Sequence, residues 1–277
     1  MRNTFYSCFF LLLAITLKAQ ITYSNEDSLI FNEKLVELKV LQLSANTHHT
    51  ATIGSTFLGT PYMEKTLEIG DKETLVVNFR GLDCTTFVEN TLAFSLLLKA
   101  PEQDFNAFAR ILKTIRYRDG NLKGYPSRLH YFTDWIRNNN EKGIVKDITS
   151  DLGGVDVQKP INFMGTHRNL YPFLANDKNF ETMLEVESQL AEESLCVLPQ
   201  SEIQSQEHNI KDGDIIALAT SIEGLDVTHT GYAITVNKRI HLLHASSSGE
   251  VTITKEPLVE YLKKIKSNTG IIVARPL

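Results

Sequence analysis

Residues 81–100 read GLDCTTFVENTLAFSLLLKA, a stretch that contains one of the three cysteines of the chain. From Cys84 to Lys99, apolar residues occur on nearly every side of a helical wheel, which predicts a buried α-helix that begins at the cysteine. Asp83 comes just before it, and aspartate is a residue type that often caps a helix. The sequence therefore predicts a thiol at the N-terminus of a buried helix.

The position of Cys84 favours reactivity. Unpaired backbone N–H groups and the helix dipole stabilise a thiolate there, so we expect the pKa of Cys84 to lie below the ordinary value of about 8.5. Its backbone N–H is also a candidate donor to an oxyanion. Three interpretations remain open at this point: a nucleophile, a packed thiol, or one half of a disulfide with Cys196.

The rest of the chain divides into a helical part and a strand-rich part. Apolar spacing predicts helices over 28–44, 47–57, 101–117, 129–138 and 179–193, and a short strand over 74–79. After residue 200 the pattern predicts strands in 210–220, 229–236, 239–247, 250–257 and 270–277, with a short helix over 257–266. Helices first and antiparallel strands second indicate an α+β fold, and no linker divides it, so we expect one domain over residues 20–277.

Two histidines lie at the ends of predicted neighbouring strands. His229 begins HTGYAI and His244 follows RIHLL, with a hairpin turn at Asn237 and Lys238 between the strands. A tight hairpin brings these two strand ends to the same edge of the sheet. Each histidine alone would more often be a core or surface residue, but together with Cys84 they form a candidate catalytic set.

Composition and motifs disfavour several other classes of protein. Paired metal ligands such as CxxC or HxxxH do not occur in the sequence, and neither does a glycine-rich phosphate loop, so no metal or other cofactor is expected. The formal net charge is −5 and the pI is near 5.9, with no basic cluster. These features disfavour nucleic acid and anionic membranes as partners.

The first nineteen residues have the pattern of a signal peptide. Arg2 supplies a positive charge, an apolar run extends from Phe9 to Leu17, and Ala19 is a small residue suited to cleavage. The run is too short for an ordinary membrane-spanning helix, and Cys8 precedes it, whereas a lipid anchor would need a cysteine after it. We expect an exported protein, periplasmic or secreted, without a stable membrane anchor after cleavage. An uncleaved anchor is the alternative.

Several blocks carry a resemblance to a known superfamily. The four main ones are LGTPY (58–62), GLDCTTF (81–87), HTGYAI (229–234) and HASSSG (244–249). They resemble the NlpC-type, papain-like cell-wall cysteine peptidases and amidases, although DCTTF stands where DCSGF is usual. Three further blocks lie in a long helical insertion at about 100–200 and resemble the N-acetylmuramoyl-L-alanine amidase-like branch: RYRDG (116–120), SRLHYFTDWI (127–136) and THRNLYP (166–172).

The resemblance implies a papain-like core of N-terminal helices packed on an antiparallel sheet, and it implies a mechanism. Cys84 would attack an amide carbonyl, His229 would hold the thiolate and later protonate the leaving amine, and His244 would fix the tautomer of His229. The substrate would be peptidoglycan or a muropeptide, cut between N-acetylmuramic acid and L-alanine. The alternatives are an endopeptidase of the same superfamily, which cuts between D-glutamate and a diamino acid, and a wall-binding module without catalysis.

Further residues are expected near the substrate. The resemblance places Tyr62 beside the nucleophile, although a core tyrosine is an equal alternative, and it places Arg128 and His130 on the wall of the site. A guanidinium would suit the stem carboxylate of the substrate.

Asp83 is interpreted mainly as a helix cap, and Asp226 as a substrate contact or a loop-shaping residue. Arg128 has a structural alternative, because Glu89 lies inside the apolar helix and would need a partner if buried. The block Thr166–Arg168 receives no assignment.

Overall fold

The computed structural model describes residues 21–45 and 50–277, so the predicted signal peptide lies outside the described residues. Within these ranges, no helix combines the length and the apolar character needed to cross a membrane. The helices are α1 (Asn25–Ala45), α2 (Thr50–Ser55), α3 (Cys84–Lys99), α4 (Phe105–Arg116), α5 (Phe132–Glu141), α6 (Phe163–Thr166), α7 (Asp177–Ala191), α8 (Ile203–Gln206) and α9 (Leu258–Leu262). The strands are β1 (Ile21–Thr22), β2 (Leu75–Val76), β3 (Val145–Asp147), β4 (Val155–Val157), β5 (Leu195–Pro199), β6 (Ile215–Thr220), β7 (Val227–Val236), β8 (Arg239–Ala245), β9 (Val251–Ile253) and β10 (Asn268–Pro276).

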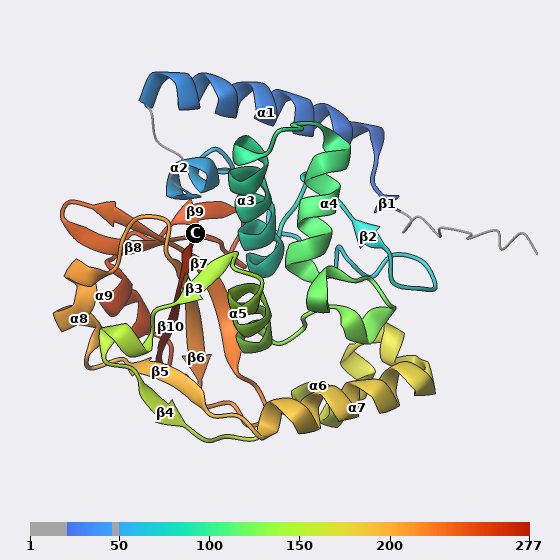
Figure 1. Ribbon diagram of the computed structural model, residues 1–277. Helices are drawn as coiled ribbons and strands as arrows, with labels where there is room; N and C mark the ends of the chain where they lie inside the picture. Colours follow the sequence, from blue (N-terminus) through green and yellow to red (C-terminus); the bar gives the residue numbers. More distant parts are fainter. Residues whose placement is uncertain (1–20, 46–49) are drawn as a thin grey trace, which may run out of the picture.

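An eight-stranded antiparallel sheet forms the centre of the molecule (Figure 1). Its strand order is β4-β5-β10-β6-β7-β8-β9, and β3 also pairs with β10. The short strands β1 and β2 pair separately, in parallel. The predicted α+β class is therefore confirmed.

Strand β6 is buried on both faces of the sheet. Ile215 and Ala217 point into the larger hydrophobic core, which the sheet shares with α3, α4 and α5. Ile216 and Leu218 point into a second core beneath α8 and α9. Burial on both faces explains why this strand is apolar at every position from Ile215 to Ala219.

Helix α3 begins at Cys84, as the sequence predicts. The Asp83 carboxylate accepts a hydrogen bond from the Thr86 backbone N–H at 2.7 Å, and the Thr86 hydroxyl accepts one from the Asp83 N–H at 2.9 Å. This reciprocal pair is a capping box, which satisfies two backbone donors at the helix start and fixes where the helix begins. Asp83 is thus the expected cap.

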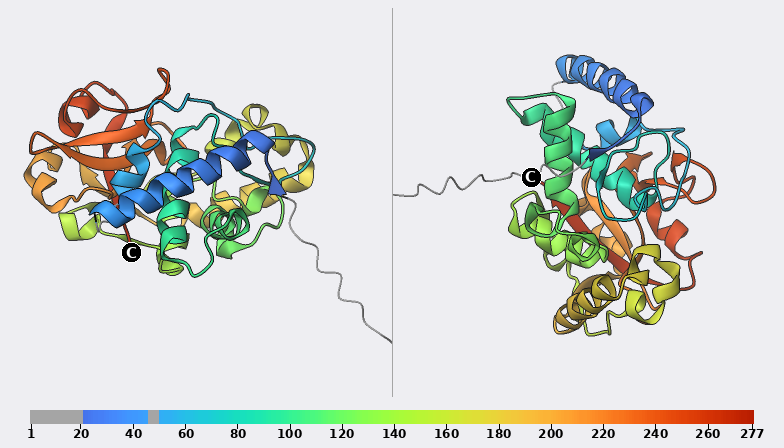
Figure 2. Two further views of the ribbon diagram at one scale, coloured as in Figure 1. Left: turned by 90° about the horizontal axis from the view of Figure 1, so that it is seen from above. Right: turned by 90° about the vertical axis from the view of Figure 1, so that its right-hand side faces the viewer.

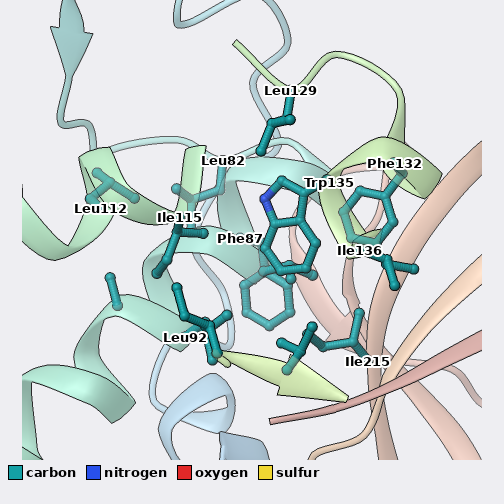
Figure 3. Close-up of a cluster of buried hydrophobic side chains, with 14 of the residues drawn as sticks. Leu82, Phe87, Leu92, Leu112, Ile115, Leu129, Phe132, Trp135, Ile136 and Ile215 are labelled. Atoms are coloured by element: carbon teal, nitrogen blue, oxygen red, sulfur yellow. The ribbon is translucent and has the colours of Figure 1, made fainter. Parts of the chain in front are cut away.

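Trp135 of α5 joins the predicted insertion to the main core. Figure 3 shows its indole ring above Phe87 of α3, with Leu82 and Phe132 beside it. The Trp135 and Phe132 rings are stacked, with centroids 4.9 Å apart. Because Trp135 and Phe87 are fully buried, α5 belongs to the same core as the helix that carries Cys84.

A buried ion pair lies between α3 and α4. The Arg116 Nε atom is 2.7 Å from a Glu89 carboxylate oxygen, and Arg116 also donates to the Val76 carbonyl at 2.6 Å. Both side chains are only 2% exposed. The expected partner for Glu89 therefore exists, but it is Arg116; the alternative that assigned Arg128 to Glu89 is wrong.

The structure differs from the sequence prediction at several element boundaries. Helix α4 begins at Phe105 rather than at Pro101, because the Asp104 side chain caps it by accepting from the Ala107 N–H at 2.7 Å. Helix α5 begins at Phe132 rather than at Leu129. The segment 144–178, predicted to be irregular, supplies strands β3 and β4, and β5 follows the helix predicted over 179–193.

Candidate active site

Cys84 and His229 line one cavity of about 130 Å³ at the N-terminus of α3. The His229 end of β7 and the first turn of α3 meet there, as predicted from widely separated parts of the sequence. In the described part of the chain, no hydrogen bond directly joins the Cys84 thiol to the His229 ring. The other lining residues are Thr85, His130, Tyr131, Phe132, Met164, Tyr171, Leu225, Asp226, Val227, Thr228 and Thr230.

His229 and His244 are joined by a short hydrogen bond. The distance from His229 Nε2 to His244 Nδ1 is 2.6 Å, and the two rings meet edge to face. One nitrogen of this pair donates and the other accepts. If Nε2 of His229 is the donor, its Nδ1 atom is left free to act as a base.

The β7–β8 hairpin aligns the two histidines. Asn237 and Lys238 both have positive φ, 50° and 66°, which suits the tight turn of a two-residue hairpin. Strand pairing then continues from Val236 and Arg239 to Tyr232 and Leu243, which brings the far ends of both strands together.

Gly231 allows the two strands to approach closely beside the histidines. A Cβ atom at this position would lie 2.6 Å from the Leu243 carbonyl oxygen and 2.9 Å from the His244 Cβ atom. Both distances are shorter than real contacts of this kind. The glycine of HTG therefore sets the separation between His229 and His244.

Burial favours the uncharged forms of the catalytic candidates. It raises the pKa of Cys84 to about 12, and the negative charge of Asp83 adds to the effect, while hydrogen bonds from Thr230 and Thr85 oppose it. The expectation that the helix terminus lowers the pKa of Cys84 is therefore wrong: desolvation outweighs the helix dipole. Burial, with a smaller contribution from His244, lowers the pKa of His229 to about 3, and burial lowers that of His244 to about 4.

Cys84 and Cys196 are both free thiols in the structure. Cys196 lies on β5, where it is opposite Asp156 of β4. Cys84 and Cys196 therefore do not form a disulfide in the structure.

Tyr62 lies beside the start of α3. It pairs with Leu82 in a short parallel bridge, and its backbone N–H donates to the Gly249 carbonyl at 2.7 Å. Burial raises the pKa of the Tyr62 hydroxyl to about 12, with smaller contributions from the neighbouring ionisable groups of Cys84 and Asp83. The hydroxyl therefore stays protonated at neutral pH and remains a hydrogen-bond donor near the thiol.

His130 lines the Cys84 cavity, but Arg128 is not among the residues that line it. The His130 Nε2 atom is 2.9 Å from the Tyr125 carbonyl oxygen, and burial together with the Arg128 charge lowers its pKa well below the usual value. Arg128 is buried and pairs with Glu68 at 2.9 Å and Glu73 at 3.5 Å. Its guanidinium is thus directed to these two acids, which the sequence did not indicate as partners.

Asp226 holds the β6–β7 loop against α5. One of its oxygens accepts from both the backbone N–H and the hydroxyl of Thr133, each at 2.8 Å, and the other accepts from the Val227 N–H at 2.7 Å. Burial raises its pKa. The loop-shaping alternative for Asp226 fits these contacts, although the residue also lines the cavity.

Lys159 secures the same loop from the other side. Its Nζ atom donates to the carbonyls of Thr220, Ile222 and Leu225, at 2.6 to 2.8 Å. Burial lowers its pKa, and the Asp226 charge opposes this. The chain leading to His229 is thereby anchored at both Lys159 and Thr133.

Sequence analysis missed several residues around the thiol. Met164 and Tyr171 line the cavity from the predicted insertion, and Tyr261 of α9 lies close enough to Cys84 for that group to raise its pKa, although burial is the larger cause. Tyr131 also lines the cavity, and it lies in the SRLHYFTDWI block that the sequence had linked to the amidase-like branch. Tyr171 belongs to the THRNLYP block, so that block was a usable signal. Arg168 of the same block instead pairs with Asp177 at 2.6 Å.

Among the described residues, no group of three or more His, Cys, Asp or Glu side chains is arranged to hold a metal ion.

Comparison with known proteins places this arrangement in a family. Residues 52–271 match the family model described as N-acetylmuramoyl-L-alanine amidase-like. The chain belongs to the N-acetylmuramoyl-L-alanine amidase-like family. The superfamily branch inferred from the sequence blocks is thus confirmed. A search of curated proteins found no match to the chain.

Solved structures support the assignment to the amidase-like family. A Bacteroides uniformis N-acetylmuramoyl-L-alanine amidase is 39% identical, with a TM-score of 0.79, over 83% of this chain and 97% of that one. A Bacteroides fragilis protein named as a candidate xylanase is 42% identical, with a TM-score of 0.76, over 80% and 98% of the two chains. A Legionella pneumophila protein of the family DUF1460 shares the fold at 22% identity, with a TM-score of 0.65, over 90% and 97%.

Proposed function

We propose that this member of the amidase-like family hydrolyses the amide between N-acetylmuramic acid and L-alanine in peptidoglycan or its fragments, with Cys84 as nucleophile. The observation that carries the proposal is the His229–His244 hydrogen bond of 2.6 Å beside a cavity that Cys84 and His229 both line. A nucleophile, a base and a group that orients the base are what covalent catalysis on an amide requires. Export through the predicted signal peptide would bring the protein to that substrate.

The reaction begins from an uncharged pair, since burial favours the thiol of Cys84 and the imidazole of His229. His229 takes the thiol proton on Nδ1 as the sulfur attacks the lactyl carbonyl carbon. His244 accepts the Nε2–H of His229 and thereby holds the ring in the required tautomer. The Cys84 backbone N–H, which has no intrahelical acceptor in the first turn, and the Tyr62 hydroxyl are the candidate donors to the oxyanion.

Collapse of the tetrahedral intermediate breaks the C–N bond. The imidazolium of His229 gives its proton to the departing amine of L-alanine, which leaves a thioester between Cys84 and the lactyl group. Water then loses a proton to His229 and attacks the thioester. N-acetylmuramic acid leaves with a free carboxyl group, and the proton returns to the Cys84 thiol.

Glycoside hydrolysis, suggested by the name of the Bacteroides fragilis protein, is less well supported. Most glycosidases need two carboxyl groups that flank the scissile bond. Asp226 is the one acid among the residues that line the Cys84 cavity, and both of its oxygens already accept hydrogen bonds. The cavity therefore fits cysteine chemistry better.

The test is digestion of defined muropeptides, with products identified by mass. We expect a muramyl-tripeptide to give free N-acetylmuramic acid and an intact tripeptide with an L-alanine N-terminus, and we expect the tripeptide alone to stay uncut. Cys84→Ser should lower turnover about a thousandfold or more, with an unchanged circular dichroism spectrum. His229→Ala should lower turnover by as much, and His244→Ala should lower it less. Release of a muramyl-dipeptide would instead identify the endopeptidase alternative, and an uncut muramyl-tripeptide would reject the amidase.

A further inference from the structure

A second hollow, of about 550 Å³, lies next to the candidate active site. We call it the β8–β9 groove; its walls include His244, Ser248, Glu250, Thr252, Lys255 and Tyr261. His244 lines this groove and His229 lines the Cys84 cavity, so the hydrogen-bonded histidine pair separates the two hollows. The two hollows therefore lie on opposite sides of the histidine pair.

The groove is lined by hydroxyl groups and one aromatic ring close to the catalytic candidates. Thr252 is directly opposite His244 in the β8–β9 ladder, so the two side chains lie on the same face of the sheet. The Tyr261 ring meets the His244 ring edge to face at 5.7 Å. An aromatic face with hydroxyls around it suits a ligand that has both apolar C–H faces and hydroxyl groups.

The lining of the groove has little net charge, which suits a neutral glycan. Its lining includes two acids, Glu250 and Glu256, and one lysine, Lys255. Glu256 pairs with Lys264, which leaves one exposed acid, Glu250, and one exposed lysine, Lys255. A stem peptide brings carboxylates of its own, whereas a glycan whose lactyl group is in amide linkage is neutral. A neutral glycan therefore needs no unbalanced charge in the groove to hold it.

The volumes of the two hollows also favour a glycan in the groove. Ligand sites usually measure about 300–1,000 Å³, a range that includes the groove and excludes the Cys84 cavity. The smaller cavity is therefore suited to the scissile amide and the first residue attached to it. Figures 1 and 2 show α9, beside the groove, and the α6–α7 segment, beside the cavity, at separate ends of the molecule.

From these observations we infer that the β8–β9 groove is a glycan-binding site. It binds N-acetylmuramic acid and the sugar linked to it. The Tyr261 ring packs against the face of a sugar ring, and the Thr252 hydroxyl makes a polar contact. The stem peptide then leaves Cys84 on the other side, along the insertion. This inference rests on the proposed function, because it gives the direction in which that substrate lies across the site.

A kinetic test compares two substrates with the same tripeptide, one carrying a disaccharide and one carrying N-acetylmuramic acid alone. We expect Tyr261→Ala to raise KM for the disaccharide substrate about tenfold, with kcat little changed. Tyr261→Phe keeps the ring and should stay near wild type, and Thr252→Val should raise KM by a smaller factor. Lys263→Ala, at the exposed residue that directly follows α9, is the control. Unchanged KM values in Tyr261→Ala would overturn the inference and leave the amidase proposal intact.

A binding test separates this inference from the amidase proposal. In Cys84→Ala protein, amide NMR shifts are followed while two ligands are titrated separately: the free tripeptide, and the disaccharide whose lactyl group is a neutral primary amide. We expect the disaccharide to shift the amides of Ser248 and Thr252, and Tyr261→Ala to abolish the shifts. Shifts caused by the tripeptide instead, or by neither ligand, would reject the glycan site. Disaccharide shifts in Cys84→Ala, combined with a wild-type protein that cleaves no muropeptide, would reject the amidase proposal alone.

Discussion

The charge state of Cys84 is the property of a single residue that most affects this site. Because burial and Asp83 raise its pKa to about 12, we expect the free protein to hold a neutral thiol at pH 7. The ultraviolet absorbance of thiolate should be absent at neutral pH, and alkylation by iodoacetamide should keep accelerating above about pH 9. Rapid alkylation that reaches a plateau near neutrality would instead show a thiolate–imidazolium pair.

Substitutions of Asp83 can separate its role as a helix cap from the effect of its negative charge on the pKa of Cys84. Asp83→Asn keeps an N-cap side chain but removes the negative charge that raises the pKa of Cys84. We expect the pH profile of alkylation to move to lower pH, with stability near wild type. Asp83→Ala should in addition cost about 1 kcal/mol of unfolding free energy in urea titrations, because the cap is lost. An unmoved alkylation profile in Asp83→Asn would mean that its charge does not reach the thiol.

The site residues that could be predicted from local sequence are those at a recognisable position in a helix or strand. Cys84 stands at a helix start, and His229 and His244 stand at strand ends, so each had a signal of its own. Tyr261 had none, and Arg128 was indicated only by the block it belongs to, with no signal for its partners. The partners of Arg128, Glu68 and Glu73, lie in an irregular segment more than fifty residues earlier, and no local pattern encodes such a pairing.

Among the helices and strands, those stabilised by residues close in sequence were predicted, and those stabilised by pairing with distant segments were not. Helix α3 was predicted from Cys84 to Lys99, because its cap and its apolar sides are both readable. Strands β3 and β4 have three residues each and exist only as partners of β10 and β5. Their pairing is long-range, so composition alone did not reveal them.

The β7–β8 hairpin gives a prediction at this scale. Gly231→Ala would place a Cβ atom 2.6 Å from the Leu243 carbonyl oxygen, so β8 has to move and carry His244 away from His229. We expect muropeptide turnover to fall at least as far as in His244→Ala, with the far-ultraviolet circular dichroism spectrum retained. Val236→Ala, at the other end of the same strand, tests whether any change in β7 has this effect. Wild-type turnover in Gly231→Ala would show that the strand separation does not matter.

For the whole molecule, the buried histidines predict how stability depends on pH. The pKa values of His229 and His244 are lowered to about 3 and about 4, while the unfolded chain titrates near the ordinary value of 6.5. Between pH 6.5 and about 4 the unfolded chain binds protons that the folded protein does not, so stability falls as pH falls. Buried acids with raised pKa values, such as Glu89, give the opposite slope.

A double variant isolates the contribution of the histidines. His229→Gln/His244→Gln removes the two groups and leaves the acids in place. Between pH 7 and pH 5, urea unfolding should show wild type losing up to about 4 kcal/mol relative to the variant. Parallel changes in the two proteins would mean that the histidines are protonated in the folded state.

Lys159 has a consequence for how the site meets its ligand. The Lys159 ammonium group binds two carbonyl groups of the loop before His229, those of Ile222 and Leu225, and ties them to the Thr220 carbonyl at the end of β6. The loop cannot lift unless its two bonds to Lys159 break together. This wall of the cavity is therefore preorganised: its ordering entropy is lost during folding and does not have to be lost again at each encounter. Discrimination between ligands at this wall then depends on rigid fit, with little induced adjustment.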